Sequence, residues 1–448
     1  MIRLNFSHGD QEEHGKAIER IRRISNRQGK TVAILQDLQG SKIRIGALKE
    51  PVYRLKQGDS FTLFGHQIVG DGQGASTSHS RLYKRVSSGD LILLNDGQIV
   101  LCVEEISGRN GRAPKDVLCK IMEGGMLAPH KGVNVPGKEL GVSAMTRKDW
   151  NDLKFGLDHG VDFVALSMVK SAKEILSVKK FIKEAKKPTA VIAKLELAVA
   201  IANLTEIIEA ADGVMVARGD LGVDLPPEQV PLLQKEIIRR ANSAHIPVIT
   251  ATQMLESMIM QARPTRAEAS DVANAVLDGT DALMLSGETA TGAYPIEAVR
   301  MMDRIILAAE RQPQLTDTSI TTGLSVSEAV SKAACLLARE MNATAIVTST
   351  LSGAAALRLS KYRPPVPIIA FTPSDEIKRR MSLYWGVSAH FISKQPQARL
   401  TGEDIFKEMI QEVRRANLAK KGDLLVLVSQ SPKVETIPTD LIKVYQML

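Results

Sequence analysis

The chain alternates short apolar runs with amphipathic helical stretches, and this alternation restricts its possible folds more than any other feature. Helical stretches begin near Asp10 and at Thr265, each followed three residues later by the glutamate of a capping box, Glu13 and Glu268. Repeated strand and helix units predict a parallel sheet, and this many favour a (β/α)8-type TIM barrel. Seven runs are strand-like: residues 2–6, 31–35, 161–167, 190–193, 213–216, 247–250 and 282–285.

Two further regions have different patterns. Between residues 43 and 135 the apolar period shortens to that of strands, and Asn95-Asp96-Gly97 between two such runs is typical of a hairpin turn. We therefore predict an inserted β-barrel domain at 43–135, called the lid below, which divides the barrel into 1–42 and 136–312. A polar linker at 313–324 precedes renewed strand and helix alternation at 325–448, which predicts an open C-terminal α/β domain.

Composition narrows the class of protein. A chain of 448 residues is too long for one core. The net charge of +8 suits anionic partners, but aromatic residues make up only 4% and the basic residues are spread along the chain, so nucleic acid is not an expected partner. No apolar run approaches the ~20 residues that span a bilayer, so no membrane partner is expected. Three scattered cysteines, without metal-site spacing, suit the cytoplasm.

Polar groups follow the strand-like runs where a phosphate site would need them. Arg218, Gly219 and Asp220 come where residues 213–216 end, and Lys194 and Glu196 lie two apart on the preceding run, so both point to one face. Two carboxylates with substrate oxygens and water form a typical Mg²⁺ site, which also accepts Mn²⁺. The alternatives are a polar turn around Asp220 and an exposed ion pair between Lys194 and Glu196.

The other predicted strands end in the same way. A lone polar residue at such a place is more often structural than catalytic, but polar groups at six strand ends on one face indicate a site. The further residues at these ends are Arg3, Asn5, Ser7, His8, Asp37, Thr252, Gln253, Ser286 and Glu288.

Several longer motifs together resemble the pyruvate kinase family over nearly the whole chain. They are Arg3-Leu4-Asn5-Phe6-Ser7-His8-Gly9, Ala217-Arg218-Gly219-Asp220-Leu221-Gly222, Ala251-Thr252-Gln253-Met254-Leu255-Glu256-Ser257-Met258, Arg263-Pro264-Thr265-Arg266-Ala267-Glu268 and Leu285-Ser286-Gly287-Glu288-Thr289-Ala290. The resemblance implies phosphoryl transfer from phosphoenolpyruvate to ADP, giving ATP and pyruvate in glycolysis. It also implies a lid that closes over the barrel and a homotetramer.

The same resemblance assigns roles to individual residues. Lys194 is similar to the family's transition-state lysine, and Glu196 and Asp220 to its Mg²⁺ ligands. Thr252 and Ser286 lie where the family relays a proton to the enolate. Residues matching positions that contact phosphoenolpyruvate are Arg3, Lys194, Gly219, Asp220 and Thr252. Residues matching the nucleotide side are Asn5, Phe6, Ser7, His8, Arg44 and Lys148.

One departure from the family pattern bears on K⁺. Many members have a threonine that helps to bind K⁺ where this chain has Leu38, and a glutamate where it has Lys42. A fixed ammonium can supply the charge that K⁺ otherwise brings. We therefore expect activity without K⁺, with Asn5, Ser7 and Asp37 as the remnant of the K⁺ site. The alternative is that Lys42 is a surface lysine at the hinge of the lid.

Two smaller departures affect the hinge and the loop after Glu196. Ser41 replaces the family's proline, and Leu197-Ala198 stands where a polar or charged residue is usual. In the C-terminal domain, a hydroxyl-rich loop lies where the family binds a sugar-phosphate activator. N-capping of the next helix is an equally good interpretation of that loop. Its residues are Thr348, Ser349, Thr350, Ser352 and Gly353.

Family members begin with one further strand and helix, whereas here Met1 stands directly before the strand that is normally second. We therefore expect a barrel that lacks its first β/α unit and exposes two sheet edges, as a truncated gene, a misplaced start codon or a degraded copy would. One alternative function is a non-catalytic descendant that binds ligands or subunits. Another is a different phosphoenolpyruvate- or pyruvate-handling Mg²⁺ enzyme, which would need neither the lid nor Arg44 and Lys148.

Overall fold

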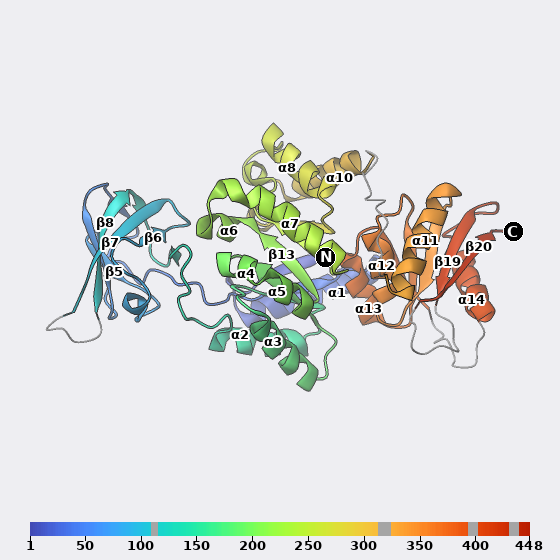
Figure 1. The fold of residues 1–448 in the computed structure, drawn as a ribbon, viewed down its shortest axis with the longest axis horizontal. Coiled ribbons are helices and arrows are strands. Elements are labelled where there is room, and N and C mark those ends of the chain that lie inside the picture. Colours follow the sequence, from blue (N-terminus) through green and yellow to red (C-terminus); the bar gives the residue numbers. More distant parts are fainter. Residues whose placement is uncertain (109–114, 312–323, 393–401, 430–438) are drawn as a thin grey trace.

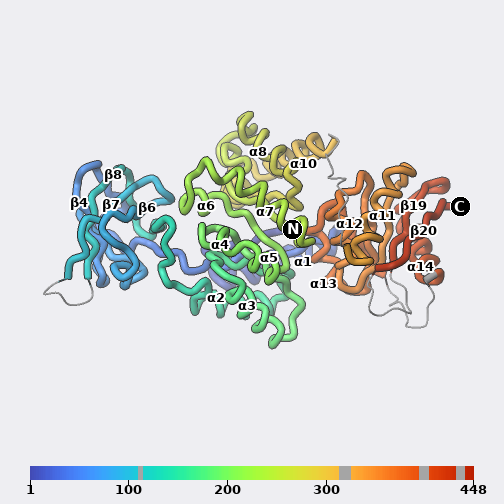
Figure 2. Tube along the Cα trace, in the orientation of Figure 1, coloured from blue at the N-terminus to red at the C-terminus, as the bar shows by residue number. Residues whose placement is uncertain are grey.

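The protein forms three lobes in a row (Figure 1). The computed structural model describes residues 1–108, 115–311, 324–392, 402–429 and 439–448. The lid lies at one end, the strand and helix units of the barrel lie in the centre, and the C-terminal domain lies at the other end. The chain enters the lid from the central lobe and returns to it, as the trace in Figure 2 shows. The predicted linker at 313–324 lies almost wholly outside the described residues.

The central lobe contains one parallel sheet of seven strands, in the order β1-β2-β11-β12-β13-β14-β15. Among the described residues, β1 and β15 have no strand on their outer sides, so the sheet is a curled half-barrel. This confirms the predicted sheet. The strands are β1 (Ile2–Asn5), β2 (Ile34–Asp37), β11 (Phe163–Leu166), β12 (Ala190–Leu195), β13 (Gly213–Ala217), β14 (Val248–Ala251) and β15 (Ala282–Met284).

The second strand shows the largest difference from the predicted boundaries. Residues 31–35 were expected as the second strand, but β2 covers Ile34–Asp37. Pairing with β1 sets this boundary, because Ile2 lies opposite Ile34 and Asn5 lies opposite Asp37. The shift makes Asp37 the last residue of the strand, at the carboxyl end where the candidate site lies.

Helices of the central lobe flank the sheet. Both predicted capping boxes form: Glu13 N donates to Asp10 Oδ1 at 2.9 Å, and Glu268 N donates to Thr265 Oγ1 at 3.2 Å. The helices are α1 (Gln11–Arg27), α2 (Arg147–Asp158), α3 (Ala172–Glu184), α4 (Ala198–Ala202), α5 (Leu204–Ala210), α6 (Arg218–Asp224), α7 (Val230–Ser243), α8 (Arg266–Leu277), α9 (Gly287–Ala290) and α10 (Pro295–Glu310).

Each face of the sheet has its own core. Val164, Val191 and Val214 pack with the flanking helices, whereas Ile192 and Met215 belong to a second cluster that continues into the C-terminal domain. Alternation along each strand produces this division, because neighbouring residues point to opposite faces. The C-terminal domain therefore packs directly against the central lobe.

The lid has its own core and its own sheet, in the order β10-β6-β7-β8-β4-β5. The predicted hairpin joins β6 to β7 through Asn95, Asp96 and Gly97, whose φ angles are 51°, 55° and 86°. The lid strands are β3 (Tyr53–Leu55), β4 (Ser60–Phe64), β5 (Gly74–Ser76), β6 (Leu91–Leu94), β7 (Ile99–Ser107), β8 (Asp116–Glu123), β9 (Gly125–Leu127) and β10 (Val133–Asn134).

The C-terminal domain is an open α/β sheet in the order β18-β17-β16-β19-β20, in which only the last described pairing is antiparallel. Strands β18 and β20 were not predicted, since both lie at sheet edges and mix polar with apolar residues. The elements are α11 (Val326–Glu340), β16 (Ala345–Ser349), α12 (Ala354–Lys361), β17 (Ile368–Thr372), α13 (Asp375–Arg380), β18 (Val387–Phe391), α14 (Gly402–Arg415), β19 (Leu424–Ser429) and β20 (Leu441–Gln446).

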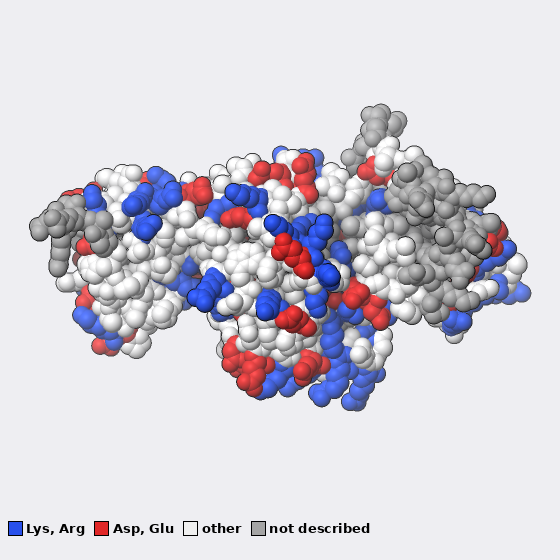
Figure 3. All heavy atoms as spheres, turned by 90° about the horizontal axis from the view of Figure 1, so that it is seen from below, with Lys and Arg blue, Asp and Glu red and all other residues white. Residues whose placement is uncertain are grey.

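The surface agrees with the dispersed charge of the sequence. On the face shown in Figure 3, basic side chains occur on all three lobes and are interspersed with acidic ones. Within the described ranges, no helix is both long enough and apolar enough to cross a membrane.

Candidate active site

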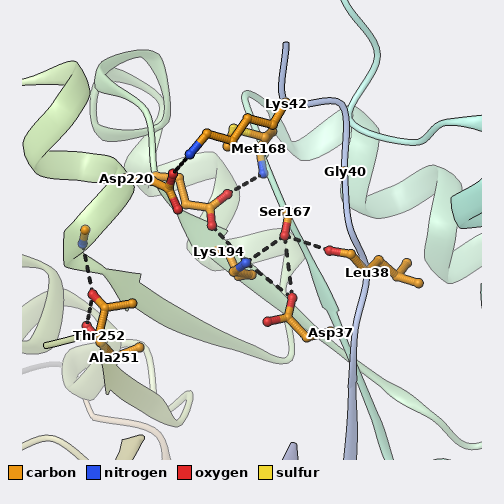
Figure 4. Close-up of polar contacts among 12 residues, drawn as sticks. Asp37, Leu38, Gly40, Lys42, Ser167, Met168, Lys194, Asp220, Ala251 and Thr252 are labelled. Atoms are coloured by element: carbon orange, nitrogen blue, oxygen red, sulfur yellow. Dashed lines mark hydrogen bonds and ion pairs between the residues drawn. The ribbon is translucent and has the colours of Figure 1, made fainter. Parts of the chain in front are cut away.

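The predicted site residues meet where the parallel strands of the central sheet end (Figure 4). Asp37 is the last residue of β2, Lys194 is the penultimate residue of β12, and Glu196 follows β12 directly. Asp220 lies in the first turn of α6, directly after β13, and Thr252 follows β14. Strand ends of a parallel sheet share one edge, so residues far apart in the sequence become neighbours.

The ammonium of Lys194 lies at the centre of this cluster. Its Nζ lies 2.8 Å from Glu196 Oε1 and 3.2 Å from Asp37 Oδ1, and it donates to Ser167 Oγ at 2.7 Å. Burial alone would lower the pKa of Lys194, but Asp37, Glu196 and Asp220 outweigh it and raise the pKa above its ordinary value. The three carboxylates therefore favour the charged form of Lys194.

Glu196 is held on both oxygens. Oε1 faces Lys194, and Oε2 accepts a hydrogen bond of 2.7 Å from Met168 N. Burial raises the pKa of Glu196, Lys194 opposes this shift, and repulsion from Asp220 adds to it. The side chains of Lys194 and Glu196 are only 12% and 1% exposed, so the alternative of an exposed ion pair is wrong.

Lys42 joins the lid to the central lobe. Its Nζ lies 2.7 Å from Asp220 Oδ1 and 2.9 Å from Asp96 Oδ1 in the lid hairpin. Burial disfavours its charge, but the two aspartates raise the pKa of Lys42 above its ordinary value. The side chain is 16% exposed, so the alternative of a free surface lysine is wrong. The Lys42 ammonium, from the hinge of the lid, therefore contacts Asp220, one of the two predicted metal ligands.

Thr252 is fixed by an unusual backbone. Its φ of 70° lies in the left-handed region, which β-branched residues rarely adopt and which costs on the order of 1–3 kcal/mol. The Oγ1 of Thr252 accepts a hydrogen bond from Gly219 N at 2.9 Å and donates to Ala251 O at 2.6 Å. The loop after β14 is thus tied to the first turn of α6, beside Asp220.

Asp37 links Arg3 to the Lys194 cluster. Arg3 Nε donates to Asp37 Oδ2 at 2.7 Å, while Oδ1 faces Lys194, so both oxygens of a 1% exposed carboxylate have cationic partners. The other two residues of the remnant K⁺ site are tied together, because Ser7 N donates to Asn5 Oδ1 at 3.1 Å. Lys42 Nζ bonds to Asp220 and not to Asp37.

The residues predicted for the nucleotide form two separate groups. In the central lobe, Lys148 Nζ donates to Phe6 O at 2.8 Å and pairs with Asp152 at 2.5 Å, and the Phe6 ring stacks on His14 with centroids 4.0 Å apart. His8 is exposed beside them. These residues surround the loop that follows β1.

Arg44 belongs to the lid side. Its Nη1 donates to His130 O at 3.0 Å, and its backbone N donates to Ser78 Oγ at 3.0 Å. Arg44 is therefore held by residues of the lid, and a ligand bound by both Arg44 and Lys148 would have to bridge the lid and the central lobe.

Ser286 follows β15 at the edge of the sheet, next to β14. Its backbone N donates to Glu288 Oε2 at 2.7 Å, and Leu255 N donates to the other oxygen of Glu288 at 3.1 Å. Glu288 is only 3% exposed, so this carboxylate holds two loops in place. Of the polar residues predicted here, Glu288 has a structural role and Ser286 stays a candidate.

The hydroxyl-rich loop of the C-terminal domain makes local hydrogen bonds. Gly353 N donates to Thr350 Oγ1 at 3.0 Å, and Ala354 N donates to Ser352 Oγ at 3.4 Å. Thr348 is fully buried, and its Oγ1 has no hydrogen-bond partner among the described residues. The N-cap of α12 is Gly353 and no side chain caps this helix, so the capping interpretation is wrong. Binding of an effector stays a prediction.

Three neighbours of the site were not predicted. Ser167 accepts from Lys194 and donates to Leu38 O at 2.8 Å, Met168 N binds Glu196, and Asp96 reaches Lys42 from the lid. Ser167 ends a predicted strand, so the reasoning applied to the other strand ends could have found it. Asp96 gave only a turn signal in the sequence.

The carboxylates suit a hard divalent cation. Asp220 borders a cleft of about 590 Å³, which is lined by Lys42, Asp96, Arg218, Gly219, Asp220 and Gln253 among others and is called the active-site cleft below. Glu196 lies outside this lining, with its Oε1 facing Lys194. No group of three or more His, Cys, Asp or Glu side chains suited to a metal occurs in the described part of the chain. Substrate oxygens and water would complete the coordination of a Mg²⁺ ion held by the two protein carboxylates.

Comparison with known proteins identifies the family. The pyruvate kinase barrel domain model matches residues 1–299, and the pyruvate kinase alpha/beta domain model matches residues 328–445. Pyruvate kinase 2 of Synechocystis sp. is 44% identical over 445 residues, which cover 99% of this chain and 74% of the relative. Pyruvate kinase of Geobacillus stearothermophilus is 42% identical over 451 residues, covering 99% and 75%.

A solved structure agrees. The crystal structure of a pyruvate kinase from Cryptosporidium parvum has a TM-score of 0.89 and 34% identity, and the match covers 100% of this chain and 90% of that one. These matches give no support to a non-catalytic descendant. The matched domain models, the relatives and the grouping of Lys194, Glu196 and Asp220 agree: the chain belongs to the pyruvate kinase family.

Proposed function

We propose that Lys194, Glu196 and Asp220 carry out the phosphoryl transfer of a pyruvate kinase, from phosphoenolpyruvate to ADP. The observation that carries this proposal is the buried Lys194 ammonium, 2.8 Å from Glu196 and 3.2 Å from Asp37 at the edge of the sheet. Phosphoryl transfer depends mainly on positioning and on charge aimed at the transferring group. A lysine whose ammonium is fixed between carboxylates supplies such a charge without reorganisation.

In this proposal each residue has one task. Glu196 and Asp220 hold Mg²⁺ or Mn²⁺, which neutralises charge on the phosphoryl group and on the enolate when bound. Arg3, Gly219 and Thr252 orient phosphoenolpyruvate, and the fixed Oγ1 of Thr252 suits it to pass a proton, together with Ser286. The nucleotide would lie between the lid and the central lobe, against Asn5, Phe6, Ser7, His8, Arg44 and Lys148.

Glu196→Gln tests the assignment with two measurements. A coupled assay for pyruvate, with phosphoenolpyruvate, ADP and Mg²⁺, should show a loss of kcat of at least about 100-fold, as for removal of a key electrostatic group. Mn²⁺ binding, followed by electron paramagnetic resonance, should weaken in the same variant. Glu209→Gln, an exposed residue on α5, is the matched control. Unchanged Mn²⁺ binding and activity in Glu196→Gln would rule the assignment out.

We also propose that Lys42 replaces the charge of K⁺. Its support is the Nζ position, 2.7 Å from Asp220 and next to the active-site cleft, together with the absence of a ligand oxygen on Leu38. Activity in sodium-only and potassium buffers should then agree within about twofold. Lys42→Met should lower activity in both buffers. A many-fold stimulation of the wild-type protein by K⁺ would contradict this proposal.

Two further proposals concern the oligomeric state and an effector, and both follow from the resemblance to the family. We propose a homotetramer, which light scattering after size-exclusion chromatography would test. We propose a sugar phosphate as effector at residues 348–353, supported by the exposed Ser352 side chain in the loop between β16 and α12. Fructose 1,6-bisphosphate and glucose 6-phosphate should change the KM for phosphoenolpyruvate, and Ser352→Ala should reduce the change. An identical response in that variant would exclude this loop.

A further inference from the structure

Arg218 lines the active-site cleft, but the proposed reaction assigns it no task. It is the first residue of α6, two positions before Asp220, and its side chain is only 12% exposed. An arginine at a phosphate site often binds the phosphate through two parallel N–H bonds. The hydrogen-bond partners of the Arg218 guanidinium show whether it is free to do so.

Each nitrogen of this guanidinium already has a partner inside the protein. Nη1 donates to Asp271 Oδ1 at 2.6 Å, and Nη2 donates to Thr252 O at 2.7 Å. Nη2 also lies 2.8 Å from Met254 Sδ. A phosphate could therefore bind Arg218 only by displacing these partners. The longer contacts, at 3.4 or 3.5 Å, go to Ala251 O, Gln253 O and Gln234 Oε1.

Most of these partners belong to the loop after β14, which has a strained backbone. Thr252 and Gln253 are consecutive non-glycine residues with φ angles of 70° and 54°, both in the left-handed region. Such a conformation persists only where the surrounding structure holds it. The guanidinium of Arg218 contacts the carbonyl oxygens of Ala251, Thr252 and Gln253, and so spans the strained part of the loop.

The same loop is held at two further points. Gly219, the residue after Arg218, donates its backbone N–H to Thr252 Oγ1 at 2.9 Å. Glu288 holds the far end of the loop by accepting from Leu255 N at 3.1 Å. Of these contacts, only those of Arg218 bind the carbonyl oxygens of the two left-handed residues. The direction of the Thr252 hydroxyl therefore depends on a backbone conformation that Arg218 stabilises.

We propose that Arg218 is a positioning residue for Thr252 and does not bind substrate phosphate. It holds the loop in the left-handed conformation that keeps Thr252 Oγ1 beside Gly219 and Asp220, and Asp271 of α8 fixes the guanidinium in turn. This role rests on the proposed function of Thr252. A lysine could not take it over, because a single ammonium lacks the planar array of donors that reaches several acceptors at once.

A double-mutant cycle in the coupled pyruvate assay tests the proposal. Arg218→Met should lower kcat by about 10- to 100-fold, as misplacement of a reacting group by about 1 Å does. Thr252→Val lacks the hydroxyl that Arg218 positions, so adding Arg218→Met to it should change kcat by less than about twofold. Arg218→Lys should recover little activity. Equal losses of kcat in both backgrounds, or full recovery in Arg218→Lys, would overturn the proposal.

Hydrogen exchange tests the loop independently of activity. Arg218→Met should speed exchange at Gly219 and at residues 252–254, whereas Arg300→Met, an exposed position on α10, should leave both exchange and kcat unchanged. Urea unfolding shows whether each variant is folded, and Asp271→Ala replaces Arg218→Met in both experiments if that variant is unstable. Unchanged exchange in the folded variant would refute the positioning role. A wild-type protein without pyruvate kinase activity would instead contradict the proposed function, and exchange would still decide whether Arg218 holds the loop.

Discussion

Two buried lysines lie at opposite ends of the central sheet, and their pKa values shift in opposite directions. At the carboxyl ends of the strands, Asp37, Glu196 and Asp220 outweigh burial and raise the pKa of Lys194. At the amino ends, Lys361 from α12 reaches Asp281 before β15, where burial dominates and lowers the pKa of Lys361 to about 8. The charge of Lys194 is favoured by three carboxylates, whereas Lys361 shares one carboxylate with a second cation, Arg363.

The amino ends of the strands repeat one arrangement. Asp162, Asp212 and Asp281 precede β11, β13 and β15, and each accepts a backbone N–H from the neighbouring strand at 2.7 or 2.8 Å. Each also pairs with at least one basic side chain. These partners are Arg22 and Arg379 for Asp162, Lys179 for Asp212, and Lys361 and Arg363 for Asp281.

The two ends of the sheet differ in what their charged residues do: those at the amino ends stabilise the fold, and those at the carboxyl ends form the proposed active site. At the amino ends, carboxylates are bound by backbone and basic groups, and Asp162 and Asp281 join the central lobe to the C-terminal domain. At the carboxyl ends, Asp220 borders an open cleft, and its partner Lys42 comes from the hinge. Substitutions at the amino ends should therefore change the free energy of unfolding, and those at the carboxyl ends should change kcat.

The largest loss of stability is expected for Asp281→Ala. The substitution leaves Lys361 and Arg363 buried without their carboxylate, which typically costs about 3–5 kcal/mol. Urea unfolding followed by circular dichroism measures the loss, and Asp158→Ala, an exposed aspartate at the end of α2, is the control. Equal unfolding midpoints for the two variants would contradict the stabilising role of the ion pairs at the amino ends of the strands.

A pH effect is expected next in size. Between pH 8 and the ordinary pKa of 10.5, Lys361 is neutral in the folded protein but protonated in the unfolded chain. The unfolded chain then binds more protons, so stability rises with pH across this window, by at most about 3 kcal/mol from Lys361. Urea unfolding from pH 7.5 to 10.5 should show this rise in the wild-type protein relative to Lys361→Met. Parallel pH profiles would contradict it.

The smallest effect is expected for Asp212→Ala. The side chains of Asp212 and Lys179 are 30% and 31% exposed, so water replaces much of their interaction. The remaining effect is the loss of the hydrogen bond from Val191 N, which should lower the free energy of unfolding by about 1–2 kcal/mol. The same urea titration distinguishes this value from that of Asp281→Ala. A loss as large as that of Asp281→Ala would show that burial does not set the order.

The sequence predicts the features that depend on local patterns. Strand periodicity, the capping boxes at Asp10 and Thr265, and the hairpin at Asn95-Asp96-Gly97 all involve residues close in the chain. The site was found because parallel strands end at one edge, which requires no knowledge of side-chain contacts. The same rule missed only Ser167 among the partners of Lys194.

Contacts between lobes could not be predicted. Lys42 meets Asp96 and Asp220, which are 54 and 178 residues away, and only the docking of the lid brings them together. The pairing of Lys361 with Asp281 depends in the same way on the position of the C-terminal domain. Such contacts depend on tertiary packing and leave no periodic signal in the sequence. The predicted domain boundaries stay a prediction.

The central claim is that one end of the sheet performs chemistry and the other end provides stability. The most direct measurement compares Lys194→Met with Lys361→Met in the coupled pyruvate assay and in urea unfolding. We expect Lys194→Met to unfold cooperatively and to lose at least about 100-fold in kcat. We expect Lys361→Met to change the unfolding midpoint and its pH dependence, with kcat within about twofold of the wild-type value. A near-normal kcat for Lys194→Met, or an equal loss of kcat in both variants, would contradict the claim.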